Sequence, residues 1–289
     1  MRLALILAVV VVGLIAVVAG TRVYGASRWH GETVALRAKL EAGREAVLPA
    51  VVDFMELEGL PAPVQRYFRA VLKPGAPMLA GAHLQQTGTM NMSEDGEQWK
   101  TFKADQLVVM RRPGFDWDAR ILMFPGVAAA VHDSFASGEG ALHASILGAF
   151  TVAEIRGGHD LAKGELMRWL AEAAWYPTAL LPSQGAKWEA VDEHSAFVSL
   201  TEASVTVKLL CRFNEHDLID SFRAESRTRT SGGKSTSAPW EGRFWNYAER
   251  DGMVVPLEGE VAWMLPSGRK PYWRGLVTAI EYTTAATRK

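Results

Sequence analysis

The chain has 289 residues, of which 48% are hydrophobic and 22% are charged. This is the composition of a folded globular protein, and it excludes a largely disordered chain. The formal net charge of -1 gives no electrostatic reason to expect a nucleic-acid partner. The single cysteine, Cys211, excludes an intrachain disulfide and a cysteine cluster for zinc or iron–sulfur. We name no metal ligand and expect no cofactor.

Residues 3–20 contain no charged side chain. As a helix rising about 1.5 Å per residue, they would nearly cross a hydrocarbon core about 30 Å thick. The segment is longer than the apolar region of a typical cleavable signal peptide, about 7–15 residues, and no cysteine follows it to carry a lipid. We predict a transmembrane anchor over residues 1–22. A signal peptide cleaved near Gly20 and a buried core helix remain alternatives.

The charges around this anchor bear on its orientation. Arg2 precedes the apolar segment, while Arg22, Arg28, Arg37 and Lys39 follow it. The positive-inside rule would place the rest of the chain in the cytoplasm, but long domains are often translocated despite such charges. We expect a single-pass membrane protein with its domain on the extracytoplasmic side. The arginines argue for the opposite side.

Two helices are expected after the anchor. Residues 32–58 carry apolar side chains among scattered charges and indicate a juxtamembrane helix with a break at Pro49, so residues 23–59 are a predicted helical linker. From Leu60 apolar residues recur at helical spacing. Pro61 suits the first turn of that second, amphipathic helix.

From His83 onward the apolar period changes to two. In residues 115–123, Phe115 and Trp117 share one face while Asp116 and Asp118 occupy the other. Similar segments recur every 8–14 residues or so between turn signals, with no alternation of strands and helices. This pattern is typical of an antiparallel meander.

One helix interrupts the strands, over residues 160–176. Glu165, Arg168 and Glu172 form a narrow polar stripe on an otherwise apolar helix. We expect the helix to lie buried against the concave face of the sheet, with its charges paired inside the protein. The predicted fold is therefore α+β: a curved, half-barrel-like antiparallel sheet of about eleven strands packed on two or three helices. Residues 60–289 would form this single β-rich domain.

No nucleophile-elbow or zinc-protease motif occurs in the sequence. If residues 137–138 form a two-residue hairpin loop, His132 and His143 lie opposite each other, about 5 Å apart at Cβ. Asp133 would then point to the other face. Metal binding, acid–base chemistry and an ordinary polar pair all remain open for these histidines.

Two groups of carboxylates have the same ambiguity. Asp116 and Asp118 lie about 7 Å apart on one strand face, where they would serve acid–base work or simply face solvent beside Arg120. Glu172 is a possible catalytic carboxylate on the helix. We name no catalytic residue. The polar candidates for a ligand site are Asp116, Asp118, Arg168, Glu172, His132 and His143.

The ten tryptophans indicate either a large aromatic core or a cavity for an apolar ligand between helix and sheet. The sequence pattern does not separate these interpretations. The candidate cavity-lining residues are Trp117, Trp169, Leu170, Trp175, Trp245 and Trp263.

Five segments resemble an uncharacterised bacterial family of membrane-anchored proteins: residues 60–67, 113–119, 164–172, 175–177 and 239–242. The resemblance extends over about residues 60–282 and implies no activity. The architecture is similar to the lipoprotein-localisation-factor (LolA/LolB) fold, whose members hold acyl chains in a concave apolar cavity.

We predict a membrane-tethered, non-catalytic binding protein for a hydrophobic or lipid-like ligand. The alternatives are a cell-envelope hydrolase that uses carboxylates, and a structural or assembly protein. A cavity of several hundred Å³ lined mainly by apolar side chains would favour binding. Converging buried carboxylates or histidines would favour the enzyme, and a solid core would favour the structural role.

Overall fold

In the computed structural model, which describes residues 2–94, 96–231 and 234–285, thirteen strands form one antiparallel sheet. The strand order is β6-β5-β4-β3-β2-β1-β13-β12-β11-β10-β9-β8-β7. Strands β1–β6 and β7–β13 are two meanders, which join where β1 pairs with β13. The strands are β1 Leu79–Asn91, β2 Trp99–Val109, β3 Gly114–Phe124, β4 Val127–Ala136, β5 Glu139–Ile146, β6 Phe150–Arg156, β7 Lys187–Asp192, β8 Ser195–Glu202, β9 Val205–Phe213, β10 Ile219–Ser231, β11 Lys234–Arg250, β12 Met253–Leu265 and β13 Gly268–Thr284.

The predicted α+β fold with a curved antiparallel sheet is confirmed, although the sheet has more strands than expected. Two of its strands, β6 and β7, form the outer edges. Their side chains are mostly exposed, so neither strand shows the alternation of buried and exposed residues that marks a half-buried strand. Edge strands of this kind are the hardest to recognise from the apolar pattern.

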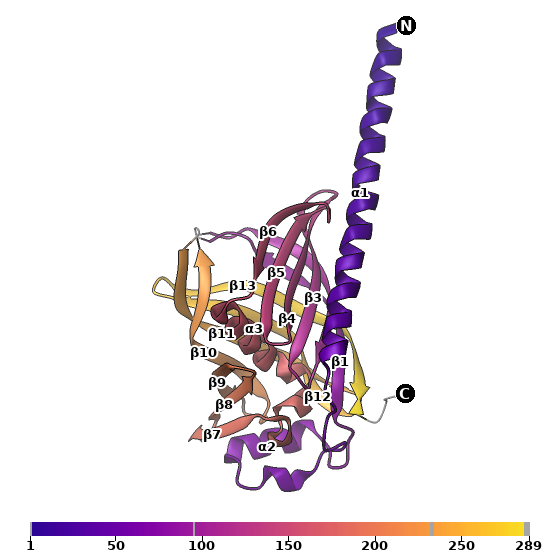
Figure 1. The fold of residues 1–289 in the computed structure, drawn as a ribbon. Helices are drawn as coiled ribbons and strands as arrows, with labels where there is room; N and C mark the ends of the chain where they lie inside the picture. Colours follow the sequence, from indigo (N-terminus) through magenta and orange to yellow (C-terminus); the bar gives the residue numbers. More distant parts are fainter. Residues whose placement is uncertain (1, 95, 232–233, 286–289) are drawn as a thin grey trace.

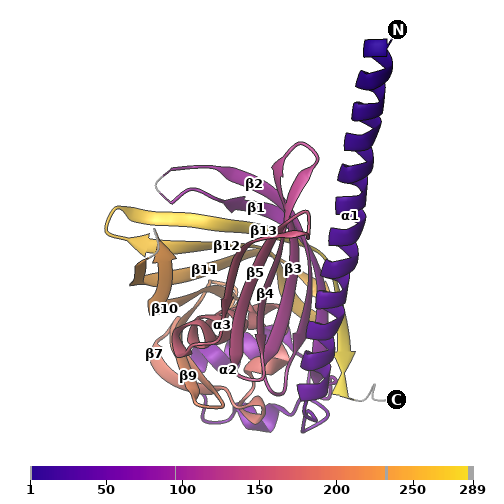
Figure 2. The same cartoon turned by 45° about the horizontal axis from the view of Figure 1, so that its top comes forward.

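Helix α3 (His159–Glu172) lies in the concavity of the sheet (Figures 1 and 2). It contacts β3, β4 and β5 of the first meander and β9 and β10 of the second. Three short 3-10 helices follow it and lead the chain to β7, and a fourth lies upstream, as does helix α2 (Ala62–Val71). The expectation that α3 packs on the concave face is confirmed. The 3-10 helices are η1 Phe54–Leu57, η2 Ala173–Trp175, η3 Pro177–Leu180 and η4 Pro182–Gln184.

Helix α1 (Arg2–Gly43) is continuous over 42 residues. The helix expected over residues 32–58 therefore ends at Gly43, and the expectation beyond that point is wrong. The physical reason is that the backbone beyond Gly43 forms hydrogen bonds with another segment of the chain instead of with itself. The amide of Val52 donates to the carbonyl of Ala76, and the amide of Met78 donates to the carbonyl of Ala50, so this segment pairs as extended chain.

The two halves of α1 have different environments. The N-terminal half is exposed, and the helix is long and apolar enough to cross a membrane. The C-terminal half lies against β2, β3 and β4 on the convex face of the sheet, opposite α3 (Figure 1). The concave and convex faces thus each carry one helix.

Candidate functional site

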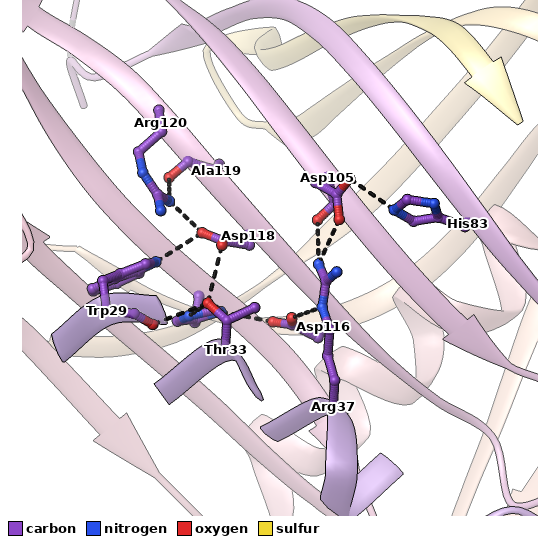
Figure 3. A network of polar contacts seen from close by, with 10 residues as sticks. Trp29, Thr33, Arg37, His83, Asp105, Asp116, Asp118, Ala119 and Arg120 are labelled. Atoms are coloured by element: carbon purple, nitrogen blue, oxygen red, sulfur yellow. Dashed lines mark hydrogen bonds and ion pairs between the residues drawn. The ribbon is translucent and has the colours of Figure 1, made fainter. Parts of the chain in front are cut away.

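Four of the six predicted polar candidates lie on the convex face: Asp116, Asp118, His132 and His143. Figure 3 shows Asp116 and Asp118 beside side chains of α1. The Trp29 Nε1 donates to Asp118 Oδ1 at 2.9 Å, and the Thr33 hydroxyl donates to Asp118 Oδ2 at 3.1 Å. Arg37 lies 2.9 Å from Asp116 and 2.7 Å from Asp105. The interpretation of Asp116 and Asp118 as a solvent-facing row is wrong, because three consecutive turns of α1 supply partners to them.

The two histidines face each other as the hairpin geometry predicts. Ser137 and Gly138 both have positive φ and form the two-residue loop, and His132 and His143 are paired in the register. The indole of Trp29 stacks on His132 at 4.5 Å and on His143 at 5.1 Å between ring centroids. These rings are therefore part of the packing between α1 and the sheet.

Each histidine also has polar partners. His132 Nδ1 donates to Asp116 Oδ1 at 2.7 Å, and His143 Nδ1 lies 2.9 Å from Glu32 Oε2 on α1. Within the described residues no group of three or more His, Cys, Asp or Glu side chains is placed to hold a metal ion. Because these carboxylates and histidines pair with one another or with side chains of α1, we interpret the convex cluster as the attachment of α1.

The concave face carries a different kind of site. A cleft of about 90 Å³ opens between α3 with its following 3-10 turn and strands β11–β13. Its walls are mainly aromatic. The aromatic lining residues are Trp117, Trp175, Trp240, Phe244, Tyr272 and Trp273.

A chain of hydrogen bonds fixes the polar side of this cleft. Trp117 Nε1 donates to Gln86, Gln86 donates to Gln106, and Gln106 donates to Glu172, at 2.8, 3.2 and 2.6 Å. Arg168 continues the chain, with bonds of 2.7 Å to Glu172 and 2.6 Å to Asp133. The stripe on α3 is thus paired inside the protein, as expected from its position on a buried helix.

The guanidinium of Arg168 also lies over the rings of Phe115 and Trp117, at 4.6 and 5.3 Å from their centroids. Burial works against its charge, but Glu172 and Asp133 outweigh burial and raise the pKa of Arg168. It therefore remains a cation in the cleft wall. Asp133 and Glu172, which share that cation, are not free for acid–base chemistry.

Glu165 is the exception among the carboxylates of α3. Burial, reinforced by the charge of Asp133, raises the pKa of Glu165 to about 8. Its nearest cation is Arg227, whose Nη2 lies 3.6 Å from Glu165 Oε1, beyond normal hydrogen-bond length. Arg227 itself lies over Trp240 at 4.6 Å and lines the cleft. At neutral pH this pair therefore leaves one cation beside the aromatic wall.

Several polar atoms at the cleft are buried and lack hydrogen-bond partners within the described structure. They are Nη1 of Arg227, Nε1 of Trp175 and Oδ1 of Asp133. A buried polar atom without a partner costs about 1–3 kcal/mol. On the convex face, by contrast, Asp116, Asp118, His132 and His143 each have a partner on α1.

Some of the residues predicted to line a cavity lie at the cleft, and others lie elsewhere. Trp117 and Trp175 line the cleft, and Arg168 and Glu172 line its polar side. Trp169 and Leu170 are buried in the core of the domain. Trp263 packs against Tyr272, and Trp245 is 42% exposed and donates to Glu258.

The sequence interpretation did not select Trp240, Trp273, Arg227 or Asp133 for the cleft. Trp240 and Trp273 converge because β11 and β13 both pair with β12. These three strands are consecutive hairpins, but the register between β12 and β13 shifts at Val261 and Ala262. Local apolar periodicity does not report such a shift, which changes the face on which a side chain lies. The alternation in β4 did indicate that Asp133 points away from His132, and so toward the concave side.

Fold and site together define a class of protein: a curved antiparallel sheet that holds an aromatic cleft over a central helix and carries a long apolar N-terminal helix. The chain matches the family described as "Family of unknown function (DUF6920)" over residues 58–282. It therefore belongs to this family, and the resemblance expected over residues 60–282 is confirmed. No curated protein matches the chain.

Among solved structures, the chain is similar to a LolA superfamily protein from Nitrosomonas europaea. The two are 11% identical in sequence, with a TM-score of 0.39. The match covers 76% of this chain and 93% of the other.

Proposed function

We propose that this protein is a membrane-tethered, non-catalytic binding protein for a hydrophobic or lipid-like ligand. The observation that carries the proposal is the aromatic cleft on the concave face, with six aromatic side chains gathered from β3, β11, β13 and the turn after α3. Cationic and polar groups stand at one side of it, so the fitting ligand is an amphiphile with an apolar body and a polar end.

The cleft differs in size and charge from the cavity that the sequence led us to expect. At about 90 Å³ it is smaller than the cavity of several hundred Å³ expected for a lipid binder, and it carries more charge. A long acyl chain enters only if the cleft widens. The unpartnered Arg227 Nη1 and Trp175 Nε1 supply donors for the polar end of a ligand once it does.

Gly242 provides a direct test, because it lines the cleft. A Cβ added there meets only the Phe244 ring at 3.9 Å, which is ordinary contact. Gly242→Leu therefore fills the cleft without disturbing the strand. Glu249→Leu, an exposed position on the same strand, is the matched control for added apolar bulk.

Native mass spectrometry of the detergent-extracted full chain should show a co-purified lipid in the wild type and in Glu249→Leu, and its loss in Gly242→Leu. Uptake of a fluorescent fatty acid from vesicles gives the second readout. Wild-type protein that neither carries lipid nor takes up the fatty acid contradicts the proposal.

We further propose that the domain, residues 60–289, lies on the extracytoplasmic side of a bacterial inner membrane, joined to the anchor of residues 1–22 through residues 23–59. Arg28 and Arg37, which argue for the opposite side, have another explanation. Arg28 pairs with Glu32, and Arg37 pairs with Asp116 and Asp105, so both serve the attachment of α1. Protease treatment of spheroplasts should remove the domain, and protection of the domain would reverse the orientation.

A second candidate, a cell-envelope hydrolase, is favoured by Glu165 alone. Its raised pKa keeps a buried carboxylic acid protonated at neutral pH, as a general acid requires. Against this role, Asp133 and Glu172 are both paired with Arg168. Hydrolysis of ester or glycoside probes by the wild type, abolished in Glu165→Gln, would establish this alternative in place of binding.

A further inference from the structure

Two hairpin turns lie beside α1 where its apolar segment ends. Arg22 donates to the carbonyl of Gly126 in the β3–β4 turn at 2.6 Å. Arg28 donates to the carbonyl of Ala149 in the β5–β6 turn at 3.2 Å. Gly25 is so close to that second turn that a Cβ would lie 2.1 Å from the Leu147 carbonyl oxygen. Both turns are thus in direct contact with the helix.

These contacts set the height of the turns along α1. At about 1.5 Å per residue, Arg22 and Gly25 lie only about 3 and about 8 Å beyond Gly20, the last residue of the apolar segment. If α1 crosses a bilayer, the turns at Gly126 and residues 147–149 lie at its polar interface. Figure 1 shows the β3–β4 and β5–β6 end of the sheet beside α1.

The strands next to these turns expose large apolar side chains. Phe124 is 66% exposed and Leu122 is 46% exposed at the end of β3. Phe150 is 60% exposed and Val152 is 61% exposed at the start of β6. A group of this kind on a soluble surface marks a contact with a membrane or a partner.

Cationic groups accompany the apolar ones. Lys100 Nζ lies 5.6 Å from the centroid of the Phe124 ring and donates to the carbonyl of Met123. Arg22 and Arg28 stand on α1 at the same level. Aromatic rings beside lysine and arginine are the side chains that anchor proteins at the headgroup layer, where anionic lipids attract the cations.

We propose that the β3–β4 and β5–β6 turns form a bilayer-contacting surface, in which Phe124 and Phe150 enter the headgroup layer of the membrane that α1 crosses. The partner is the lipid surface itself, because the group is continuous with the membrane-crossing helix and carries complementary charge. This surface is separate from the cleft, so the inference stands whether or not the cleft binds a lipid. It gives the domain three attachments to the membrane and a fixed tilt.

The test uses the full chain, with Cys211 replaced by alanine, in nanodiscs that hold one copy each. Phe124→Cys and Phe150→Cys are labelled with an environment-sensitive fluorophore, and the lipids carry a nitroxide quencher near the headgroup. Val191→Cys is the control, because Val191 is also exposed (46%) but lies on β7, at the other edge of the sheet.

We expect emission from positions 124 and 150 to be quenched roughly twofold or more, and emission from position 191 to be unchanged. Emission unchanged at all three positions overturns the proposal. Equal quenching at all three overturns it as well, since the contact would not be specific. Burial of positions 124 and 150 that appears only in crowded vesicles, and not in single-copy nanodiscs, shows that a second copy covers this surface and also overturns the proposal.

Discussion

The convex and concave faces of this sheet are built from the same strands, yet they treat polar side chains in opposite ways. On β3, Asp116 points to the convex face and is fully buried under α1, while Trp117 points to the concave face and lines the cleft. The convex carboxylates and histidines are paired with one another or with side chains of α1. The concave face has an aromatic cleft with unpartnered polar atoms in its wall. Clustered ionisable residues alone therefore do not mark a functional site; their pairing and coverage distinguish attachment from binding.

The largest expected effect is the removal of Trp29, the aromatic centre of the convex attachment. Its side chain is 2% exposed and stacks on both His132 and His143. We expect Trp29→Ala to lower the free energy of unfolding by about 3–5 kcal/mol, as for other buried aromatics. Chemical denaturation of the detergent-solubilised chain, followed by circular dichroism, measures this. Val34→Ala, an exposed position on the same helix, should change little, and equal effects would contradict the assignment.

The next effect concerns the charge that Arg37 supplies to Asp116. Arg37→Met leaves a fully buried carboxylate with His132 as its remaining hydrogen-bond partner. We expect a loss of about 3 kcal/mol, because an unbalanced buried charge is costly. The exposed pair of Lys39 and Glu139 is the matched control on the same helix, and Lys39→Met should cost less than about 1 kcal/mol. If the two variants are equally stable, α1 is not held by buried charge.

A third prediction addresses the concave side through Glu165. Its pKa is about 8 in the folded protein, above the ordinary value, so folding takes up a proton between those two values. The contribution of Glu165 to stability is therefore fully present below the ordinary pKa and declines as pH rises through about 8. Glu165→Gln removes this decline. The melting temperature of the variant minus that of the wild type should therefore rise by roughly 3–6 °C between about pH 5 and about pH 9. Parallel melting curves across that range would show that Glu165 is ionised in the fold.

The smallest effect is expected at the outer margin of the convex attachment. The hydrogen bond from His83 to Asp105 at 2.7 Å raises the pKa of His83. This pair stabilises the fold below the ordinary histidine pKa and loses that contribution as pH rises through the raised value. Asp105→Asn should move the His83 titration, followed by NMR, back toward lower pH. An unchanged titration would mean that the bond does not form in solution.

Local patterns were sufficient to predict much of this molecule. Alternation in β3 separated Trp117 from Asp116, and the two-residue loop at Ser137 and Gly138 placed His132 opposite His143. The spacing of Arg168 and Glu172 indicated an ion pair on a buried helix. These features depend on neighbours within one or two elements of the chain.

The remaining features depend on contacts that local patterns do not encode. The coverage of Asp116 comes from Arg37, which is 79 residues away. The place of Trp273 in the cleft depends on β13 lying between β1 and β12. Period and propensity report which face of a strand is buried, but not which distant helix or strand covers it.

The central pairing of β1 with β13 also determines when the sheet is completed. Leu79 pairs with Thr284, so the middle of the sheet joins segments from opposite ends of the domain. During synthesis α1 and the β1–β6 meander emerge first, and they can assemble on one another. The inner edge of β1 then stays open until β13 is made, because no earlier strand pairs there. Closure across so long a loop is slow, and an open strand edge is prone to aggregate. Strand β13 thus protects an edge of β1 that would otherwise stay open.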